Sequence, residues 1–300
     1  MKNAIKYIAL SWLFATFFSQ NLAYGSPIKV VTTTNIVHEL VLQIGGDKIQ
    51  AEALMGPGVD PHFYKATFGD MRKLAHADIV FYNGLHLEGR MQSVFDNLSS
   101  MKPVVGLGYA IEQHLLLKEN DIVDPHFWLD VRLWRQAMHE VVLRLTELAP
   151  QHADYFDARA DAYLLELNQL DVWIRQQIAT IPESRRVLIS AHNAFGYYGA
   201  AYNIEVLGLQ GINTTSEYGL QDLRHLKDII KKRKIKAVFI ESSVSERAIE
   251  SLIAGVNAEG GKVALGGQLY SDALGSAKSS AGSYIGMMRY NTRTIVKALK

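Results

Sequence analysis

The sequence contains no cysteine among its 300 residues. This absence excludes disulfide bonds, metal sites built from thiolates, and a lipid anchor on an N-terminal cysteine. An excess of charge of one sign is also missing, because 31 lysines and arginines face 30 aspartates and glutamates. Nothing therefore provides the field that would hold a nucleic acid, and we exclude nucleic acid as a partner. With 48% hydrophobic residues and 7 prolines, the composition is that of a globular protein with a sizeable core.

Long apolar runs are absent, apart from one short run near the N-terminus. Lys2 and Lys6 precede an apolar run at residues 8–18, and Ala23-Tyr24-Gly25 places small residues at both positions of a cleavage site. This pattern predicts a secretory signal peptide over residues 1–25. The run is too short for a good membrane-spanning helix, which needs about 20 apolar residues. We therefore expect a soluble, exported chain that acts as a monomer.

Short β-branched runs alternate with amphipathic stretches in both halves of the chain. Alternation at this spacing favours βαβ units and largely parallel sheets. The predicted strands cover residues 28–33, 49–54, 78–82, 104–105, 187–190, 205–207, 237–240 and 263–265. The predicted helices between them cover residues 37–44, 68–76, 194–202, 220–231, 246–256 and 284–299.

The middle of the chain has a purely helical pattern. One helix is predicted from residue 130 up to the interruption at Pro150. In the next stretch, from Phe156 to Ile181, apolar residues recur at steps of three and four, which is one stripe on a helix. We therefore predict an α/β protein with two parallel-sheet lobes, at residues 26–151 and 182–300, joined by one long helix at residues 152–181.

The tetrapeptide Asp-Pro-His-Phe occurs twice, at residues 60–63 and 124–127. Proline fixes its own φ and restricts the preceding residue, so His62 and His126 each leave a stiff loop, as metal ligands should. His192, Asp272 and His62 each follow a predicted strand. Because open parallel sheets bind ligands beyond the carboxyl ends of their strands, these three are candidates for one site. Taken singly, each histidine is more often a surface or core residue than a ligand.

Five longer motifs extend this pattern over the chain. They are MGPGVDPH at residues 55–62, NGLHLE at 83–88, DPHFWLD at 124–130, SAHNAF at 190–195 and SDALG at 271–275. With these motifs the chain, from Ile28 onward, resembles the zinc and manganese solute-binding receptors of bacterial ABC transporters, the TroA-like group. The resemblance implies a divalent metal ion in the cleft between the lobes, with His62, His126, His192 and Asp272 as its ligands. It also implies that the long helix limits closure of the lobes.

The resemblance implies a function as well: capture of a divalent transition metal in the periplasm and delivery to the membrane permease of an ABC transporter. Zinc is the first expectation, with manganese or iron as alternatives. Manganese-specific relatives usually have glutamate in place of His192, which favours zinc. Zinc-specific relatives often carry a long loop rich in histidine and acids before the second ligand, whereas residues 113–123 are few and hold only His114. The missing cysteine favours a form that is free in the periplasm.

An exported zinc-dependent hydrolase with the same histidines is the alternative function. A catalytic zinc ion keeps three protein ligands and a water molecule, so a fourth ligand, Asp272, favours a binding protein. The motifs H-E-x-x-H and G-x-S-x-G and the P-loop are absent, so we expect no enzyme. Glu241 either orients a ligand histidine or is a solvated carboxylate at a strand end. His86 is assigned no ligand role.

Overall fold

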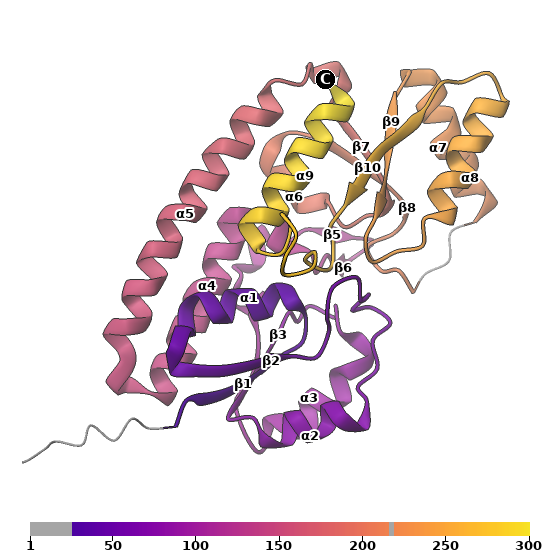
Figure 1. The fold of residues 1–300 in the computed structure, drawn as a ribbon. Coiled ribbons are helices and arrows are strands. Elements are labelled where there is room, and N and C mark those ends of the chain that lie inside the picture. Colours follow the sequence, from indigo (N-terminus) through magenta and orange to yellow (C-terminus); the bar gives the residue numbers. More distant parts are fainter. Residues whose placement is uncertain (1–25, 216–218) are drawn as a thin grey trace, which may run out of the picture.

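The computed structural model describes residues 26–215 and 219–300. The predicted signal peptide at residues 1–25 lies outside this part of the chain. Two α/β lobes lie one above the other, and the long helix α5 (Ala153–Ala179) runs along both (Figure 1). The predicted fold class, two parallel-sheet lobes with one long helix, is confirmed. No helix within the described ranges is both long enough and apolar enough to cross a membrane.

The N-terminal lobe is built on a four-stranded parallel sheet with the strand order β2-β1-β3-β4. All four residues of the central strand β3 are buried, as expected where both faces of a parallel sheet are covered. Helix α2 begins at a capping box formed by Thr67 and Asp70. The elements are β1 (Ile28–Thr32), α1 (Asn35–Gly45), β2 (Ile49–Ala53), α2 (Phe68–His76), β3 (Ile79–Tyr82), α3 (Gln92–Ser99) and β4 (Val104–Gly106).

A small antiparallel hairpin follows this sheet, formed by β5 (Lys118–Glu119) and β6 (Ile122–Val123). Its two turn residues, Asn120 and Asp121, have φ values of 48° and 65°, which asparagine and aspartate tolerate better than most residues. The chain then leads into α4 (Val131–Leu148), whose first turn is capped by the side chain of Asp130.

The C-terminal lobe holds two parallel sheets of two strands each. Strand β7 pairs with β8, and β9 pairs with β10. Strand β7 also lies beside β9, so the spatial arrangement β8-β7-β9-β10 is similar to the order β2-β1-β3-β4 of the first lobe. The elements are β7 (Val187–His192), α6 (Gly196–Tyr202), β8 (Glu205–Gln210), α7 (Leu220–Arg233), β9 (Ala237–Glu241), α8 (Arg247–Ala258), β10 (Ala264–Leu269) and α9 (Tyr284–Leu299).

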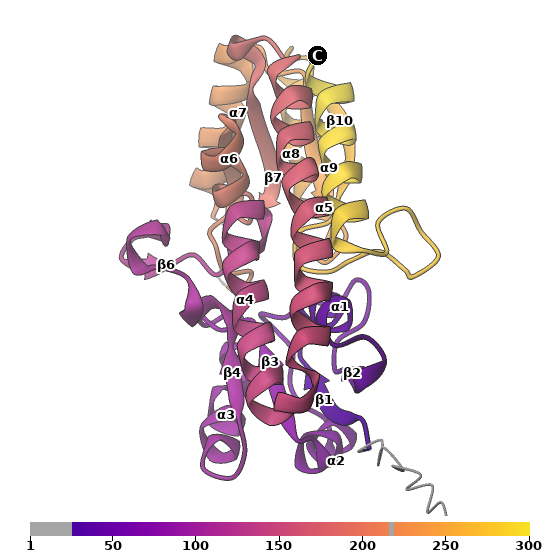
Figure 2. The ribbon, with the colours of Figure 1, turned by 90° about the vertical axis from the view of Figure 1, so that its left-hand side faces the viewer.

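Helix α5 packs on both lobes (Figure 2). It contacts α1 and α4 near one end and α6 and α9 near the other. Its buried residues, from Phe156 to Ile178, are the stripe that the sequence predicts. One cluster of buried apolar side chains runs from Val30 in β1 to Leu299 in α9, so the lobes share a continuous core. The residue limits given above for the lobes and the connecting helix (26–151, 152–181 and 182–300) stay a prediction.

Candidate metal centre

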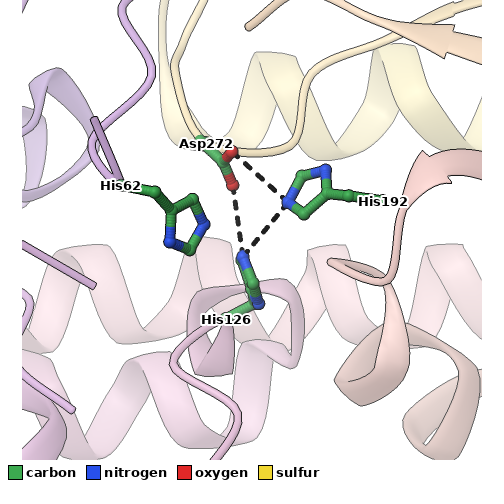
Figure 3. A group of neighbouring side chains, drawn as sticks. All are labelled: His62, His126, His192 and Asp272. Carbon is green, nitrogen blue, oxygen red and sulfur yellow. Dashed lines mark hydrogen bonds and ion pairs between the residues drawn. The ribbon is translucent and has the colours of Figure 1, made fainter. Parts of the chain in front are cut away.

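The four candidate residues His62, His126, His192 and Asp272 meet between the lobes, and we call them the tetrad (Figure 3). One possible ligand atom from each lies within 4.8 Å of those of the others. All four residues are at most 3% exposed. Within residues 26–215 and 219–300, this is the one group of histidine and acidic side chains identified as able to hold a metal ion.

Atoms of three of the residues already stand, pair by pair, at separations that ligands of one small ion adopt. The Nε2 atoms of His126 and His192 are 3.3 Å apart; the first lies 3.4 Å from Asp272 Oδ1 and the second 3.4 Å from Asp272 Oδ2. Donors bound at roughly 2.0–2.1 Å to a tetrahedral ion stand roughly 3.3–3.4 Å from one another. His62 makes no such short contact, and its ring centre is 5.4 Å from that of His126 and 5.8 Å from that of His192. The imidazole of His62 therefore stands slightly further out.

The tetrad joins the facing edges of the two lobes. His62 lies in the loop between β2 and α2, and His126 in the loop between β6 and α4. His192 is the last residue of β7, and Asp272 follows β10. Three of the four residues therefore lie at or beyond the carboxyl end of a parallel strand, where ligands of such sheets bind.

The repeated Asp-Pro-His sequence forms the same backbone turn in both copies. The side-chain Oδ1 of Asp60 accepts the backbone N–H of His62 at 2.8 Å, and that of Asp124 accepts the backbone N–H of His126 at 2.9 Å. Aspartate commonly bonds the backbone two residues onward in this way. The repeat is thus two copies of one rigid turn, each presenting a histidine.

Asp124 also holds the ring of His126. The Nδ1 atom of His126 lies 2.6 Å from Asp124 Oδ1, the distance of a hydrogen bond in which an Nδ1–H donates. A Cβ atom at Gly196 would stand 2.9 Å from Asp124 Oδ2, so this glycine makes room for the carboxylate. The hydroxyl of Tyr197 donates to the backbone carbonyl of Asp124 at 2.8 Å. A carboxylate in this position fixes the tautomer of a histidine and leaves its Nε2 atom free for a metal.

Glu241, the last residue of β9, supports His192 in a similar way. Its Oε1 accepts the backbone N–H of His192 at 2.8 Å. Its Oε2 lies 2.7 Å from the ring Nδ1, close enough for an ion pair but off the direction of a hydrogen bond. Glu241 is 1% exposed, so the solvated alternative for this carboxylate is wrong, and its position is that of a group that orients a histidine.

Both oxygens of Asp272 lie near the imidazoles of the tetrad. Oδ2 accepts a hydrogen bond from the Ser243 hydroxyl at 3.3 Å, whereas Oδ1 has no hydrogen-bond partner among the described residues. The indole N–H of Trp128, from the segment before α4, donates to the backbone carbonyl of Ser271 at 2.9 Å. The loop that carries Asp272 is therefore held from the N-terminal side of the site.

Burial and neighbouring charges separate the pKa values of the three imidazoles. Burial lowers the pKa of His62 from 6.5 to about 3, against the attraction of Asp272. Burial also acts to lower the pKa of His126, but its paired carboxylate and Asp272 outweigh burial and raise the pKa. The pKa of His192 is raised well above 6.5 for the same reasons. Despite its burial, Asp272 has a pKa well below its ordinary value because both of these histidines face it. A bound cation would therefore replace protons at the two paired histidines.

His86 lies outside the tetrad and is exposed. Its backbone φ is 65°, and the loop around it is held by buried Glu88, which accepts hydrogen bonds from the Thr33 hydroxyl at 2.6 Å and from two backbone N–H groups. This loop, the β5–β6 hairpin and residues 211–213 line a cavity of about 330 Å³ beside His62.

Three residues around the tetrad were not assigned a role from the sequence. Asp60 and Asp124 carry a signal, because each stands directly before Pro-His in the repeat. Thr214 carries none, although its hydroxyl donates to Asp60 Oδ2 at 2.8 Å. The two residues are 154 positions apart, and only the fold brings them together.

Two α/β lobes that bury three imidazoles and a carboxylate between their sheets define the class of two-lobe metal-binding proteins. Within this class, the chain belongs to the family of the zinc-uptake complex component A, periplasmic, whose sequence model matches residues 30–298. The family comprises substrate-binding proteins of metal ABC transporters, which are not enzymes.

Named relatives and a solved structure agree with this assignment. The manganese-binding lipoprotein MntA of Bacillus subtilis is 44% identical over an alignment of 297 positions, which covers 96% of this chain and 97% of the relative. The metal ABC transporter substrate-binding lipoprotein SsaB of Streptococcus sanguinis is 27% identical, with 97% and 96% covered. The structure of the periplasmic zinc-binding protein TroA of Treponema pallidum superimposes with a TM-score of 0.90 at 43% identity, covering 92% of this chain and 99% of TroA.

Proposed function

We propose that this protein binds one divalent transition-metal ion with His62, His126, His192 and Asp272 and delivers it to the membrane permease of an ABC transporter. The observation that carries the proposal is the buried tetrad, whose possible ligand atoms lie within 4.8 Å of one another. The two nitrogens of His62 and Oδ1 of Asp272 are buried without a hydrogen-bond partner among the described residues. Buried polar atoms usually have a partner, and a metal ion would supply the missing one.

The geometry favours transport over hydrolysis. Four protein donors close the coordination sphere of a tetrahedral ion, whereas a catalytic zinc ion keeps one position for water. The family also consists of transporter components, so the hydrolase alternative has no support.

We infer zinc as the preferred metal, with manganese and iron(II) as alternatives. Three imidazoles and one carboxylate form a nitrogen-rich set that suits four-coordinate zinc. Manganese stands at the weak end of the divalent series and favours oxygen ligands. The relatives differ in the metal that their names give: MntA is named for manganese and TroA for zinc.

We propose the periplasm as the place of action, reached through cleavage of the signal peptide after Gly25. MntA and SsaB are named lipoproteins. This chain has no cysteine to carry a thioether-linked lipid, so we propose that it stays free of the membrane and meets the permease by diffusion. N-terminal sequencing of the exported protein is expected to begin at Ser26. Recovery of the protein only with membranes would overturn this part of the proposal.

The direct test of the function is the metal content of the chain purified from an exporting host without tags or chelators. We expect about one zinc ion per chain by elemental analysis, and tighter binding of zinc than of manganese or iron(II) in competition titrations. Absence of bound metal, together with failure to bind any of the three ions, would refute the function. Tighter binding of manganese would refute the preference alone.

A further inference from the structure

The two Asp-Pro-His turns differ in what their aspartates do beyond the shared backbone bond. The carboxylate of Asp124 is hydrogen-bonded to the ring of His126, with Oδ1 at 2.6 Å from Nδ1. Asp60 makes no such bond, and both ring nitrogens of His62 are without a partner among the described residues. The second oxygen of Asp60 instead accepts the hydroxyl of Thr214, from the other lobe, at 2.8 Å.

No hydrogen bond among the described residues holds the ring of His62, so the hydrogen bonds that position this residue act on its backbone. That backbone is fixed by Asp60 Oδ1 on the histidine N–H, and Asp60 is fixed in turn by Thr214. His62 and Thr214 are buried, at 3% and 5% exposed, and Asp60 between them is half-buried. Water competes less for the Thr214 hydroxyl at such a position than it would at the surface.

Thr214 is itself held near the site from the N-terminal side. The backbone N–H of Ile212 donates to Glu119 Oε2 at 3.0 Å, and the amide of Asn193, next to His192, donates to Glu119 Oε1 at 2.9 Å. The segment at residues 211–214 is thus bonded to the β5–β6 hairpin by one contact and to the His62 turn by the other.

From this arrangement we infer that Thr214 is a positioning residue for His62, acting across the cleft through Asp60, and that its hydroxyl slows the release of the bound metal. This inference rests on the proposed function. The Nε2 atoms of His126 and His192 are 3.3 Å apart and each lies 3.4 Å from one of the two oxygens of Asp272, whereas His62 makes no such contact among the described residues. Loss of the Thr214 hydroxyl lets Asp60 and the His62 turn move together away from the ion, while the other three ligands keep their supports.

The test compares Thr214→Val, which removes the hydroxyl at nearly constant volume, with Thr214→Ser, which keeps it. Zinc-loaded protein is mixed with excess chelator, and the rate of zinc transfer is followed by stopped flow. We expect roughly tenfold faster release from Thr214→Val, the lower end of what loss of an outer-shell contact costs a metal site. Thr214→Ser should stay within about twofold of the wild type. The matched control is Thr215→Val, because the exposed Thr215 hydroxyl donates to Asn213 within the same segment and, among the described residues, does not contact Asp60 or the tetrad; its release rate should not change.

A second set of variants separates positioning from a general loosening of the protein. In a His62→Ala background, Thr214→Val should leave the rate of zinc release unchanged, because the side chain on which it acts is gone. The same fold-change in release rate in both backgrounds, or a wild-type release rate in Thr214→Val, would overturn the inference. If Thr214→Val does not fold, Thr214→Ala carries the same expectation. A wild type that binds none of zinc, manganese and iron(II) refutes the proposed function instead, so the two failures are distinguishable.

Discussion

Replacement of Asp124 tests how much the support of a ligand contributes to metal affinity. Its Oδ1 accepts the backbone N–H of His126 at 2.9 Å and lies 2.6 Å from the ring Nδ1 of the same residue. Asp124→Asn keeps an oxygen in this place but removes the negative charge. Asp124→Ala removes both contacts and leaves a buried N–H group without an acceptor.

The size of the two effects follows from these contacts. Loss of an outer-shell partner typically costs about 10- to 100-fold in metal affinity. We expect about tenfold for Asp124→Asn, or about 1.4 kcal/mol, because only the charge that makes His126 a stronger donor is lost. For Asp124→Ala we expect about 100-fold, or about 2.7 kcal/mol, because the ring also loses its fixed orientation. The free energy of unfolding of the metal-free Asp124→Ala protein should fall by about 1–3 kcal/mol, since the N–H stays unsatisfied.

The assay is competition titration with a chelator of known zinc affinity, combined with urea unfolding of the metal-free protein. Asp70→Asn is the matched control, because Asp70 is also buried and bonds its own local backbone, but at the start of α2 and away from the tetrad. It should lower the free energy of unfolding by about 1 kcal/mol and leave zinc affinity unchanged. Wild-type affinity in Asp124→Asn and Asp124→Ala would refute the reasoning that this carboxylate supports the metal site.

Three further predictions concern the tetrad. Alanine at any tetrad position should weaken zinc binding severely, whereas His38→Ala and His152→Ala should change it little. The zinc affinities are measured by calorimetric titration, and an unchanged affinity in two of the four tetrad variants would refute the ligand set. The pKa values of His126 and His192 are raised, so at a pH below these values the metal must displace one proton from each histidine. Metal affinity should therefore fall as the pH is lowered from about 7.5 to 5.5, by at most about a hundredfold per pH unit. His62, with a pKa of about 3, adds nothing to the pH dependence in this range. An affinity that stays constant across the range would contradict the pairing of His126 and His192 with carboxylates. His192→Glu should shift the ratio of affinities toward manganese in direct competition, and an unchanged ratio would count against the role of the third imidazole.

Most helices and strands could be predicted because their periodicity is local. The predicted bounds of α2 and α9 agree with the structure, and the long buried stripe identifies α5. Helix α3 was not predicted, because it has only eight residues, of which Phe95 and Leu98 are buried, too few to show a period. The β5–β6 hairpin was also missed, since each of its strands has two residues. Strand β10 was predicted too short because Gly266 and Gly267, typical of loops, lie inside it.

The proximity of the four tetrad residues was expected from strand ends and from the family resemblance, whereas their supports were harder to predict, for a physical reason. The candidate ligands leave a trace in the sequence because each lies in a stiff loop or at a strand end, which local residues determine. Supporting contacts join residues far apart in the chain, such as Glu241 and His192, 49 positions apart, or Thr214 and Asp60. A glutamate at a strand end or a threonine in a loop has many ordinary roles, and only the packing of the lobes selects one of them.

The shared core has a consequence for how this molecule can be divided. Trp134 of α4 stacks on Tyr284 of α9, with ring centres 4.9 Å apart, and the Tyr284 hydroxyl donates to the carbonyl of Trp128 at 2.7 Å. A chain that ends after α4 would leave Trp134 without the ring of Tyr284, and α1 and α4 without the helix α5 that packs on them. Neither lobe is therefore a module that can be transferred by itself. Domain swaps between relatives would have to carry α4, α5 and α9 together, and the protein should unfold as one cooperative unit.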